Sequence, residues 1–406
     1  MSATHPAGAR EAQASEPGSL DSTPEKWSGK FKHWYTVAAV GLLNSVLLLL
    51  LLNLVLYALM RARQPANLEA PQISFDPDRL HKAYPGWRGE DVRSLMLETL
   101  REKEYEPFTG FRETPNHGKF VNIDPAGFRV SKGQGPWPPD PKSMNVFVFG
   151  GSTAFGANVP DDETIASYLQ EAANADRGTP PLAVYNFARQ AYFSTQELIL
   201  FEQLLRSGYV PRVAVFVDGL NDFIFADGQP LFSDRLRNFM AGKSDGSALD
   251  RVPMVRAARW LTDRWTRPTQ PQEPRTFNDT ALLHDAVDRW LANKKMIELL
   301  ANGFGVRPIF VWQPVPVYKY DLRYHFFLHS INEFAAYGRS GYGYPLMEEL
   351  RAQGKLGPNL LWLADMQRDK RENLYVDSIH YNAPFSKEIA GRIYAFLRES
   401  VQAANK

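Results

Sequence analysis

The chain has 406 residues, which is enough for one large domain with extensions. Its 46 basic and 45 acidic residues leave a net charge of +1, so the basic surplus typical of nucleic-acid-binding proteins is absent. It contains no cysteine, which excludes a disulfide framework, a thiolate metal site and a cysteine nucleophile.

Residues 1–32 predict a disordered N-terminal tail. They are rich in Ala, Ser, Gly, Pro, Glu and Lys and contain almost no large apolar side chains. Such a segment cannot bury enough apolar surface to offset the entropy lost on folding.

Residues 34–60 form an uncharged apolar run that is long enough to cross a bilayer, since a spanning helix needs about 20 apolar residues. A buried core helix is disfavoured because the run, with six consecutive leucines, has no polar face. A cleaved signal peptide is disfavoured by the long polar tail and by the lack of a small-residue cleavage site. We therefore predict an uncleaved transmembrane signal anchor over residues 33–60.

The basic residues around this run bear on its orientation. Three lysines precede it and two arginines follow it: Lys26, Lys30, Lys32, Arg61 and Arg63. Because positive charge favours the cytoplasmic side, this bias predicts an inside N-terminus. The rest of the chain would then lie outside the cytoplasm, in a periplasm where the cell has one.

Residues 61–140 mix prolines, charges and aromatic side chains. They predict a linker and a lead-in segment, with a short helix over 91–103 and strand-and-turn structure over 105–130. Gly127, which follows Pro125 closely, marks a turn.

From residue 144 the pattern alternates between buried strands and amphipathic helices. The predicted strands are 145–151, 183–188, 213–219, 308–314 and 360–366. The predicted helices are 164–175, 194–208, 280–303, 327–337 and about 384–401, and an insertion over 223–278 carries a further helix at 255–265. This alternation predicts a three-layer α/β/α sandwich with a five-stranded parallel sheet, flavodoxin-like, over residues 141–406. In such sheets the chemistry lies at the carboxyl ends of the strands.

Ser152 lies directly after the first predicted strand, in the segment FGGSTAFG. Gly151 and the glycine before it let the chain turn sharply, so the hydroxyl is left at the sheet edge, where a serine can attack an acyl carbon. The alternative is that the Gly-Gly-Ser-Thr sequence only caps the next helix.

Asp377 and His380 stand three residues apart in VDSIH, before the last predicted helix. In a turn, this spacing lets the carboxylate accept from one ring nitrogen, so that the other nitrogen faces the serine. A pair of polar turn residues is the alternative.

Asn221 follows the third predicted strand, in VDGLND, where its amide can donate to an oxyanion. The alternative is a turn-forming residue. Asp222 is interpreted as a capping or scaffold residue, and Asn186, which follows the second strand, as a residue that fixes the loops around the site.

These segments resemble the four blocks of the SGNH (GDSL-type) hydrolase family, over roughly residues 144–400. The resemblance implies Ser152 as nucleophile, Asp377 and His380 as the rest of a triad, and Asn221 as side-chain oxyanion donor. The N–H groups of Ser152 and Ala191 would complete the oxyanion hole.

The second block departs from the family pattern Asn-x-Gly-x-x-Gly. Here YNFARQA has Ala188 and Ala191 where the family has glycine. The backbone N–H of Ala191 can still donate if its dihedral angles are allowed for an L-residue. Arg189 would lie near the pocket mouth, either meeting an anionic substrate or, as the favoured interpretation, forming a surface salt bridge.

The sequence therefore predicts a membrane-anchored serine hydrolase that acts on esters, as an esterase or deacetylase. A segment ending in NIDPAGFR resembles one that precedes the hydrolase domain in membrane-linked bacterial relatives, some of which add or remove acetyl groups on cell-surface polysaccharide. An O-acyltransferase with the same residues and an inactive membrane-anchored binding or assembly protein remain alternatives. No cofactor, metal or nucleic acid is expected to take part, and no P-loop or His-Glu-x-x-His spacing occurs.

Overall fold

The computed structural model describes residues 24–63, 81–176, 182–241, 252–266, 277–330, 334 and 337–404. The chain divides into two compact units. The first takes in Met1–Asn67 and Gly246–Gln270, and the second takes in Leu68–Asp245 and Pro271–Lys406. Residues 1–23 of the predicted disordered tail lie outside the described residues.

The first unit contains α1 (Pro24–Arg63) and α9 (Pro253–Thr266). The stretch Gly29–Met60 of α1 is long and apolar enough to cross a membrane. Residues 24–32, which we expected to be disordered, are helical, because α1 continues into them from the apolar stretch.

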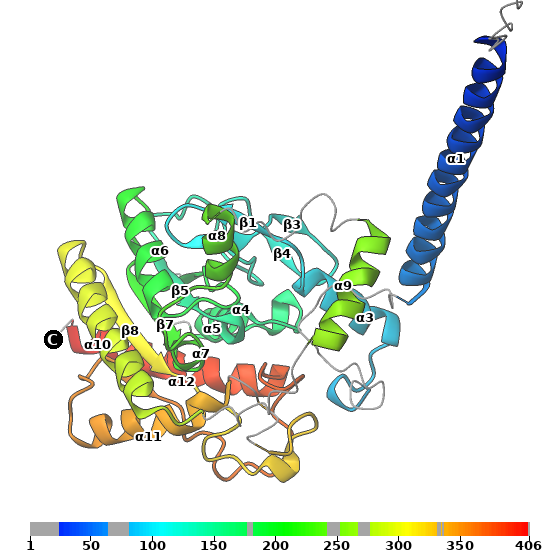
Figure 1. Ribbon diagram of the computed structural model, residues 1–406. Helices are drawn as coiled ribbons and strands as arrows, with labels where there is room; N and C mark the ends of the chain where they lie inside the picture. Colours follow the sequence, from blue (N-terminus) through cyan, green and yellow to red (C-terminus); the bar gives the residue numbers. More distant parts are fainter. Residues whose placement is uncertain are drawn as a thin grey trace, which may run out of the picture. The chain divides into compact units, whose positions relative to one another are not determined.

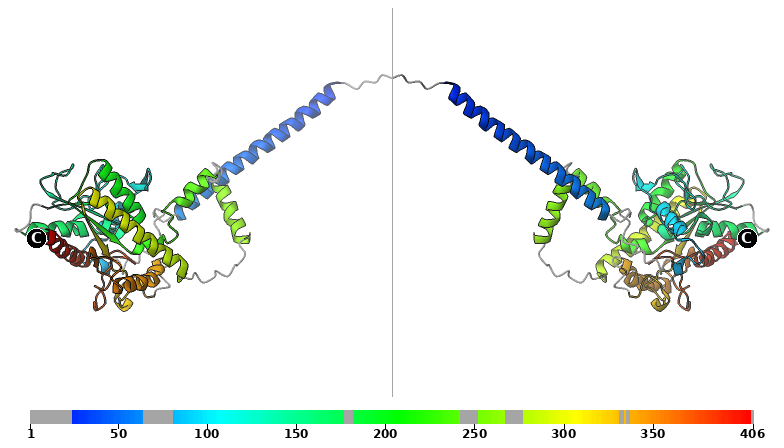
Figure 2. Two further views of the ribbon diagram at one scale, coloured as in Figure 1. Left: turned by 90° about the vertical axis from the view of Figure 1, so that its left-hand side faces the viewer. Right: turned by 90° about the vertical axis from the view of Figure 1, so that its right-hand side faces the viewer.

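Helix α9 comes from the insertion at 223–278, and its contacts were not expected. It packs against α1 (Figure 2), and the Met254 N–H donates to Asn53 Oδ1 at 3.0 Å. This part of the insertion therefore belongs to the first unit and not to the sheet-containing one.

The second unit is built on one five-stranded parallel sheet (Figure 1). Its strands, in spatial order, are β6 (Leu182–Asn186), β5 (Met144–Gly150), β7 (Val213–Asp218), β8 (Arg307–Trp312) and β9 (Leu360–Trp362). All four neighbouring pairs are parallel. The predicted α/β sandwich with five parallel strands is confirmed.

The two faces of the sheet carry different side chains, because successive residues of a strand point to opposite faces. Valines such as Val146 and Val148 face one layer, which includes α5 (Ile165–Ala175) and α12 (Ala383–Ala404). Aromatic side chains such as Phe147 and Phe149 face the other, which includes α6 (Ser194–Arg206), α10 (Thr280–Gly303) and α11 (Arg339–Ala352). Both faces are therefore covered, as a parallel sheet requires.

The lead-in segment is part of the second unit. It forms α3 (Gly89–Thr99), the antiparallel pair β1 (Lys103–Glu106) and β2 (Gly110–Glu113), and the pair β3 (Asn116–His117) and β4 (Asn122–Ile123). The N–H of Arg129 donates to the Asn186 carbonyl oxygen at 2.8 Å, so the lead-in meets the sheet at the end of β6. The expected boundary at residue 141 therefore does not separate compact units.

Shorter elements complete the fold, and one predicted helix lies partly outside the described residues. The short elements are α4 (Ser152–Phe155), α7 (Leu220–Ile224), α8 (Ser233–Met240) and the 3₁₀ turns Asp161–Glu163 and Leu322–Tyr324. Within the helix expected over 327–337, residues 327–330 are not helical and residues 334 and 337 have 3₁₀ conformation, whereas the other positions lie outside the described residues. Helix α11 begins at Arg339. The apolar run had suggested a helix, whereas the helix that forms contains Pro345.

Candidate active site

Ser152 is the first residue of α4, directly beyond the carboxyl end of β5. Gly151 is the N-cap residue, and no side chain caps the helix. The Thr153 hydroxyl donates to Gln313 Oε1 at 2.5 Å instead. The alternative in which Ser and Thr only cap the helix therefore does not describe this turn, and the first N–H groups of α4 are left without intrahelical partners.

Gly151 owes its identity to the close approach of Asn221. A Cβ atom built on Gly151 would overlap the Asn221 amide nitrogen and would lie 3.1 Å from the Tyr192 carbonyl oxygen. Asn221, in α7, donates to that carbonyl oxygen at 2.6 Å. An amide carries two N–H donors, so one remains available beside Ser152.

Asp377 and His380 are hydrogen-bonded to each other, with Nδ1 of the ring 2.6 Å from Oδ2 of the carboxylate. The second oxygen, Oδ1, accepts from the N–H groups of Ile379 at 2.8 Å and His380 at 2.9 Å. Burial alone would raise the pKa of Asp377, but the His380 ring and these N–H groups outweigh it and hold the pKa below its usual value. The carboxylate is therefore ionised at neutral pH and orients the ring.

Two side chains join the loop of Asp377 and His380 to the segment that carries Ser152. Asn158 donates to Asp377 Oδ2 at 2.6 Å. Gln313, just beyond β8, accepts from Thr153 at 2.5 Å and from the Tyr381 hydroxyl at 3.1 Å. The neighbours of Ser152 and of His380 thus share one acceptor, which brings the two segments to the same edge of the sheet.

The Ser152 hydroxyl and the His380 ring are not hydrogen-bonded to each other in the described part of the chain. His380 Nε2 is buried and finds no partner among the described residues. Catalytic hydrogen bonds are often long in a ligand-free site and shorten only when substrate is bound. The arrangement therefore offers an oriented imidazole with a free nitrogen near the serine segment.

Asn186, at the end of β6, connects three parts of this edge. Its amide donates to the carbonyl oxygens of Ala154 and Phe155 at 3.2 and 3.4 Å, and its oxygen accepts from the Ala188 N–H at 3.2 Å. It thereby holds α4 against the loop that follows β6.

Ala191 adopts a backbone conformation that favours glycine, with φ of 61°. An L-residue can adopt this left-handed region, but at a modest cost in conformational energy. Its N–H makes no hydrogen bond within the described residues and is free to donate. The position where the resemblance calls for glycine is thus one where glycine would relieve strain.

Arg189 occupies a different place from the one expected. It is only 2% exposed, and its guanidinium pairs with Glu106 and donates to the Tyr192 hydroxyl at 2.8 Å. The expectation of a surface salt bridge or of a contact with substrate at a pocket mouth is wrong, because the lead-in segment covers this side chain. The backbone N–H of Arg189 donates to the Gly150 carbonyl oxygen at 3.0 Å, which joins the second block to the first.

Asp222 lies in a buried group of carboxyls with Asp218 and Glu197. Its Oδ1 accepts from the Ser194 hydroxyl at 2.5 Å, and Asp218 Oδ2 accepts from Trp290 Nε1 at 2.9 Å. Burial raises the pKa of Asp218 to about 8, with a further contribution from Asp222. Burial, together with Asp218 and Asp222, also raises the pKa of Glu197. The Asp222 carboxyl therefore binds Ser194 at the start of α6, and its role as a scaffold residue stays a prediction.

Sequence reasoning did not identify several residues that shape this edge. Arg129 is fully buried and donates to the carbonyl oxygens of Gly156 and Val159, in the loop that follows the serine. His325 is 1% exposed, its ring stacks on Tyr375, and burial lowers its pKa to about 4. Asn158 and Gln313, which join the serine segment to the loop of His380, were also not identified from the sequence. Their partners are too distant in sequence for any local pattern to reveal them.

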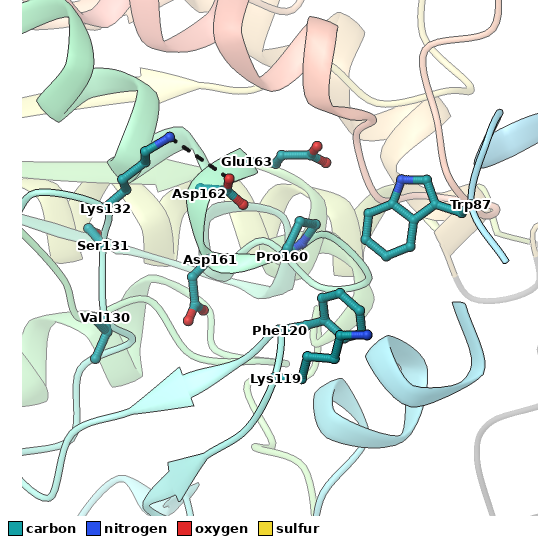
Figure 3. A pocket seen from close by; sticks show the side chains of 10 residues that line it. All are labelled: Trp87, Lys119, Phe120, Val130, Ser131, Lys132, Pro160, Asp161, Asp162 and Glu163. Carbon is teal, nitrogen blue, oxygen red and sulfur yellow. Dashed lines mark ion pairs between the residues drawn. The ribbon is translucent and has the colours of Figure 1, made fainter. Parts of the chain in front are cut away.

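An open cavity of about 560 Å³ lies on one side of the loop that follows the serine. Figure 3 shows Trp87, Phe120, Pro160 and Glu163 around it. Burial, with a smaller effect of a neighbouring carboxylate, raises the pKa of Glu163 to about 7. None of the predicted catalytic residues lines this cavity, so it is separate from the site built above.

Comparison with known proteins gives structural similarities only. No family model matches the chain, and no curated protein matches its sequence. Several solved structures are similar to it in fold. An acetyl xylan esterase, AlAXEase, matches with a TM-score of 0.36 and 12% identity over 62% of this chain and 98% of that one.

Two further matches have similar extents. The psychrotrophic esterase EstA from Pseudoalteromonas sp. has a TM-score of 0.35 and 12% identity over 64% of this chain and 100% of that one. A putative lipolytic protein of the G-D-S-L family from Desulfitobacterium hafniense has a TM-score of 0.35 and 12% identity over 63% and 99%. At these identities and TM-scores the matches describe a similarity in fold and nothing more.

Proposed function

We propose that the chain is a membrane-anchored serine hydrolase that cleaves ester bonds through Ser152, His380 and Asp377. The observation that carries this proposal is the His380 ring. One nitrogen is fixed on a buried, ionised Asp377 and the other is buried without a partner among the described residues. Gln313 and Asn158 tie that ring's loop to the turn with Ser152.

In the proposed reaction Ser152 Oγ attacks the acyl carbon of the ester while His380 Nε2 takes the hydroxyl proton. The carbonyl π electrons move to oxygen and give a tetrahedral oxyanion. When the ester bond breaks, the imidazolium returns the proton to the leaving alcohol and an acyl-serine remains. Water, deprotonated by His380, then releases the acid and restores Ser152.

The proposed oxyanion hole consists of the N–H groups of Ser152 and Ala191 and the amide of Asn221. The free N–H groups at the start of α4 and the unpaired N–H of Ala191 support this assignment. Loss of one such donor typically costs about 3 kcal/mol of transition-state stabilisation.

The apolar stretch 34–60 is the proposed membrane anchor, and the lysines that precede it support an extracytoplasmic catalytic domain. The resemblance of the lead-in to membrane-linked relatives favours acylated cell-surface polysaccharide as substrate. If a sugar hydroxyl replaces water in the second step, the same residues perform O-acyl transfer. An inactive binding protein is the alternative if no acyl-enzyme forms.

Ester turnover by the detergent-solubilised full chain tests the proposal. We expect hydrolysis of short-chain nitrophenyl esters, and release of acetate from acetylated oligosaccharides, to fall at least 10³-fold in Ser152→Ala and His380→Ala. Ser378→Ala, in the same loop as His380, is the matched control and should retain activity. Turnover that survives in Ser152→Ala would contradict the assignment, and a preference for long acyl chains would exclude an acetylated substrate.

A further inference from the structure

The turn at residues 189–192 carries the proposed oxyanion donor Ala191, and the lead-in segment holds it from outside the sheet. Arg189 pairs with Glu106, and the Gln190 N–H donates to Glu113 Oε1 at 2.9 Å. These two carboxylates stand on β1 and β2, the antiparallel pair Lys103–Glu106 and Gly110–Glu113.

Two more contacts come from the same segment. The Gln190 side chain donates to the Thr99 carbonyl oxygen at 2.7 Å, at the end of α3. The Tyr192 hydroxyl donates to the Phe111 carbonyl oxygen at 2.5 Å, and the two rings meet edge to face. Each residue that flanks Ala191 in the turn thus has a lead-in partner, while the Ala191 N–H makes no hydrogen bond within the described residues.

These contacts matter because Ala191 has φ of 61°. Glycine adopts such a conformation readily, but an alanine leaves it unless the surrounding structure fixes the flanking residues. A turn that relaxed to negative φ would redirect its N–H groups away from the oxyanion position. The buried carboxylate of Glu113, which is 7% exposed, accepts the N–H immediately before Ala191 and so opposes that relaxation most directly.

We propose that Glu113 and Glu106 of the lead-in are positioning residues that hold the Ala191 N–H in its oxyanion geometry, in place of the glycine that the turn would otherwise need. This inference rests on the proposed hydrolase function for its catalytic consequence, but the clamp itself is a structural claim. The lead-in is then part of the active site and not a spacer between anchor and enzyme.

Variants at Glu113 in the full chain test the clamp. We expect Glu113→Ala to lower kcat for a short-chain ester about tenfold with little change in KM, because the contact acts on the transition state. Glu113→Gln keeps a carbonyl acceptor and should retain most of the activity. The matched control is Glu104→Ala, which removes a carboxylate of the same hairpin that pairs with Arg112 and does not touch the turn.

Hydrogen exchange separates the clamp from the chemistry. The amides of residues 188–192 should exchange faster in Glu113→Ala than in the wild type, and should be unchanged in Glu104→Ala. If the wild type shows no esterase activity, the proposed function fails, and exchange alone then decides on the clamp. A folded Glu113→Ala variant with unchanged exchange in this segment overturns the inference.

A glycine at position 191 gives the sharper test. Since glycine adopts positive φ without the steric cost that alanine has there, Ala191→Gly combined with Glu113→Ala should recover kcat to within about threefold of the wild type. A merely structural role for Glu113 predicts the same loss with alanine or glycine at 191. That equal loss would contradict the proposal.

Discussion

At the scale of single residues, the close packing of Gly151 against Asn221 decides the geometry beside the serine. The four sequence blocks placed Gly151, Ser152, Asn221, Asp377 and His380 at one sheet edge, because each follows a strand or precedes the last helix. What they could not supply is the set of hydrogen bonds that join distant segments. Asn158 and Asp377 are 219 positions apart, and Thr153 and Gln313 are 160 apart. No periodicity connects such pairs.

Gly151→Ala tests this packing. The new methyl group would displace the Asn221 amide, so we expect kcat to fall roughly 10²- to 10³-fold, as on loss of an oxyanion donor. Steady-state kinetics on a short-chain ester measures this. The control is Gly391→Ala in α12, where a Cβ meets nothing within 4 Å and activity should be unchanged. Wild-type kcat in Gly151→Ala would show that Asn221 does not act from its present position.

At the scale of elements, the strongly patterned segments could be predicted and the irregular ones could not. Helix α10 matches its expected range: Asp279 caps its start, and Gly305, with φ of 69°, turns the chain just beyond its end at Gly303. Helix α11 was missed, since Gly341, Gly343 and Pro345 give it a poor helical pattern. The hairpin β1–β2 also lacks a clear alternation, and its contacts with the turn at 189–192 follow only from the fold.

The pairing of α9 with α1 gives a prediction at this scale. Asn53 lies within the apolar stretch of α1, where an unpartnered amide is unfavourable, and it accepts the Met254 N–H. Replacing Asn53 with Leu removes that acceptor, so the amides of residues 253–258 should exchange faster in a lipid nanodisc. Asn44→Leu, nearer the N-terminus of the same helix, is the control and should leave the exchange of these amides unchanged. Equal exchange in both variants would argue against the α1–α9 contact.

At the scale of the whole molecule, the buried carboxyls of Asp218, Asp222 and Glu197 make stability depend on pH. The pKa of Asp218 is raised from 3.8 to about 8 by burial and Asp222, so the folded chain holds a proton that the unfolded chain releases. This contribution to stability is fully present below about pH 4 and is lost as pH rises through about 8. Burial lowers the pKa of His325 from 6.5 to about 4, so its effect has the opposite sign. The folded chain loses this contribution to stability as the pH falls below 6.5.

Asp218→Asn should reduce the loss of stability that the wild type shows between pH 6 and 8. An amide can still accept from Trp290 but has no proton to lose, so the free energy of unfolding should fall less between pH 6 and 8 than in the wild type. Denaturant unfolding across that range measures the difference. Asp227→Asn, at an exposed position, should follow the wild-type curve. A wild-type chain that gains stability over this range would contradict the assignment.

The convergence of Ser152, His380 and Asp377 is most directly tested by locating the covalent adduct of a fluorophosphonate on the full chain by mass spectrometry. We predict a single adduct on Ser152, absent from Ser152→Ala and strongly slowed in His380→Ala and Asp377→Asn, all of which remain folded. A folded wild-type chain that forms no adduct, or forms it on another side chain, would contradict the account.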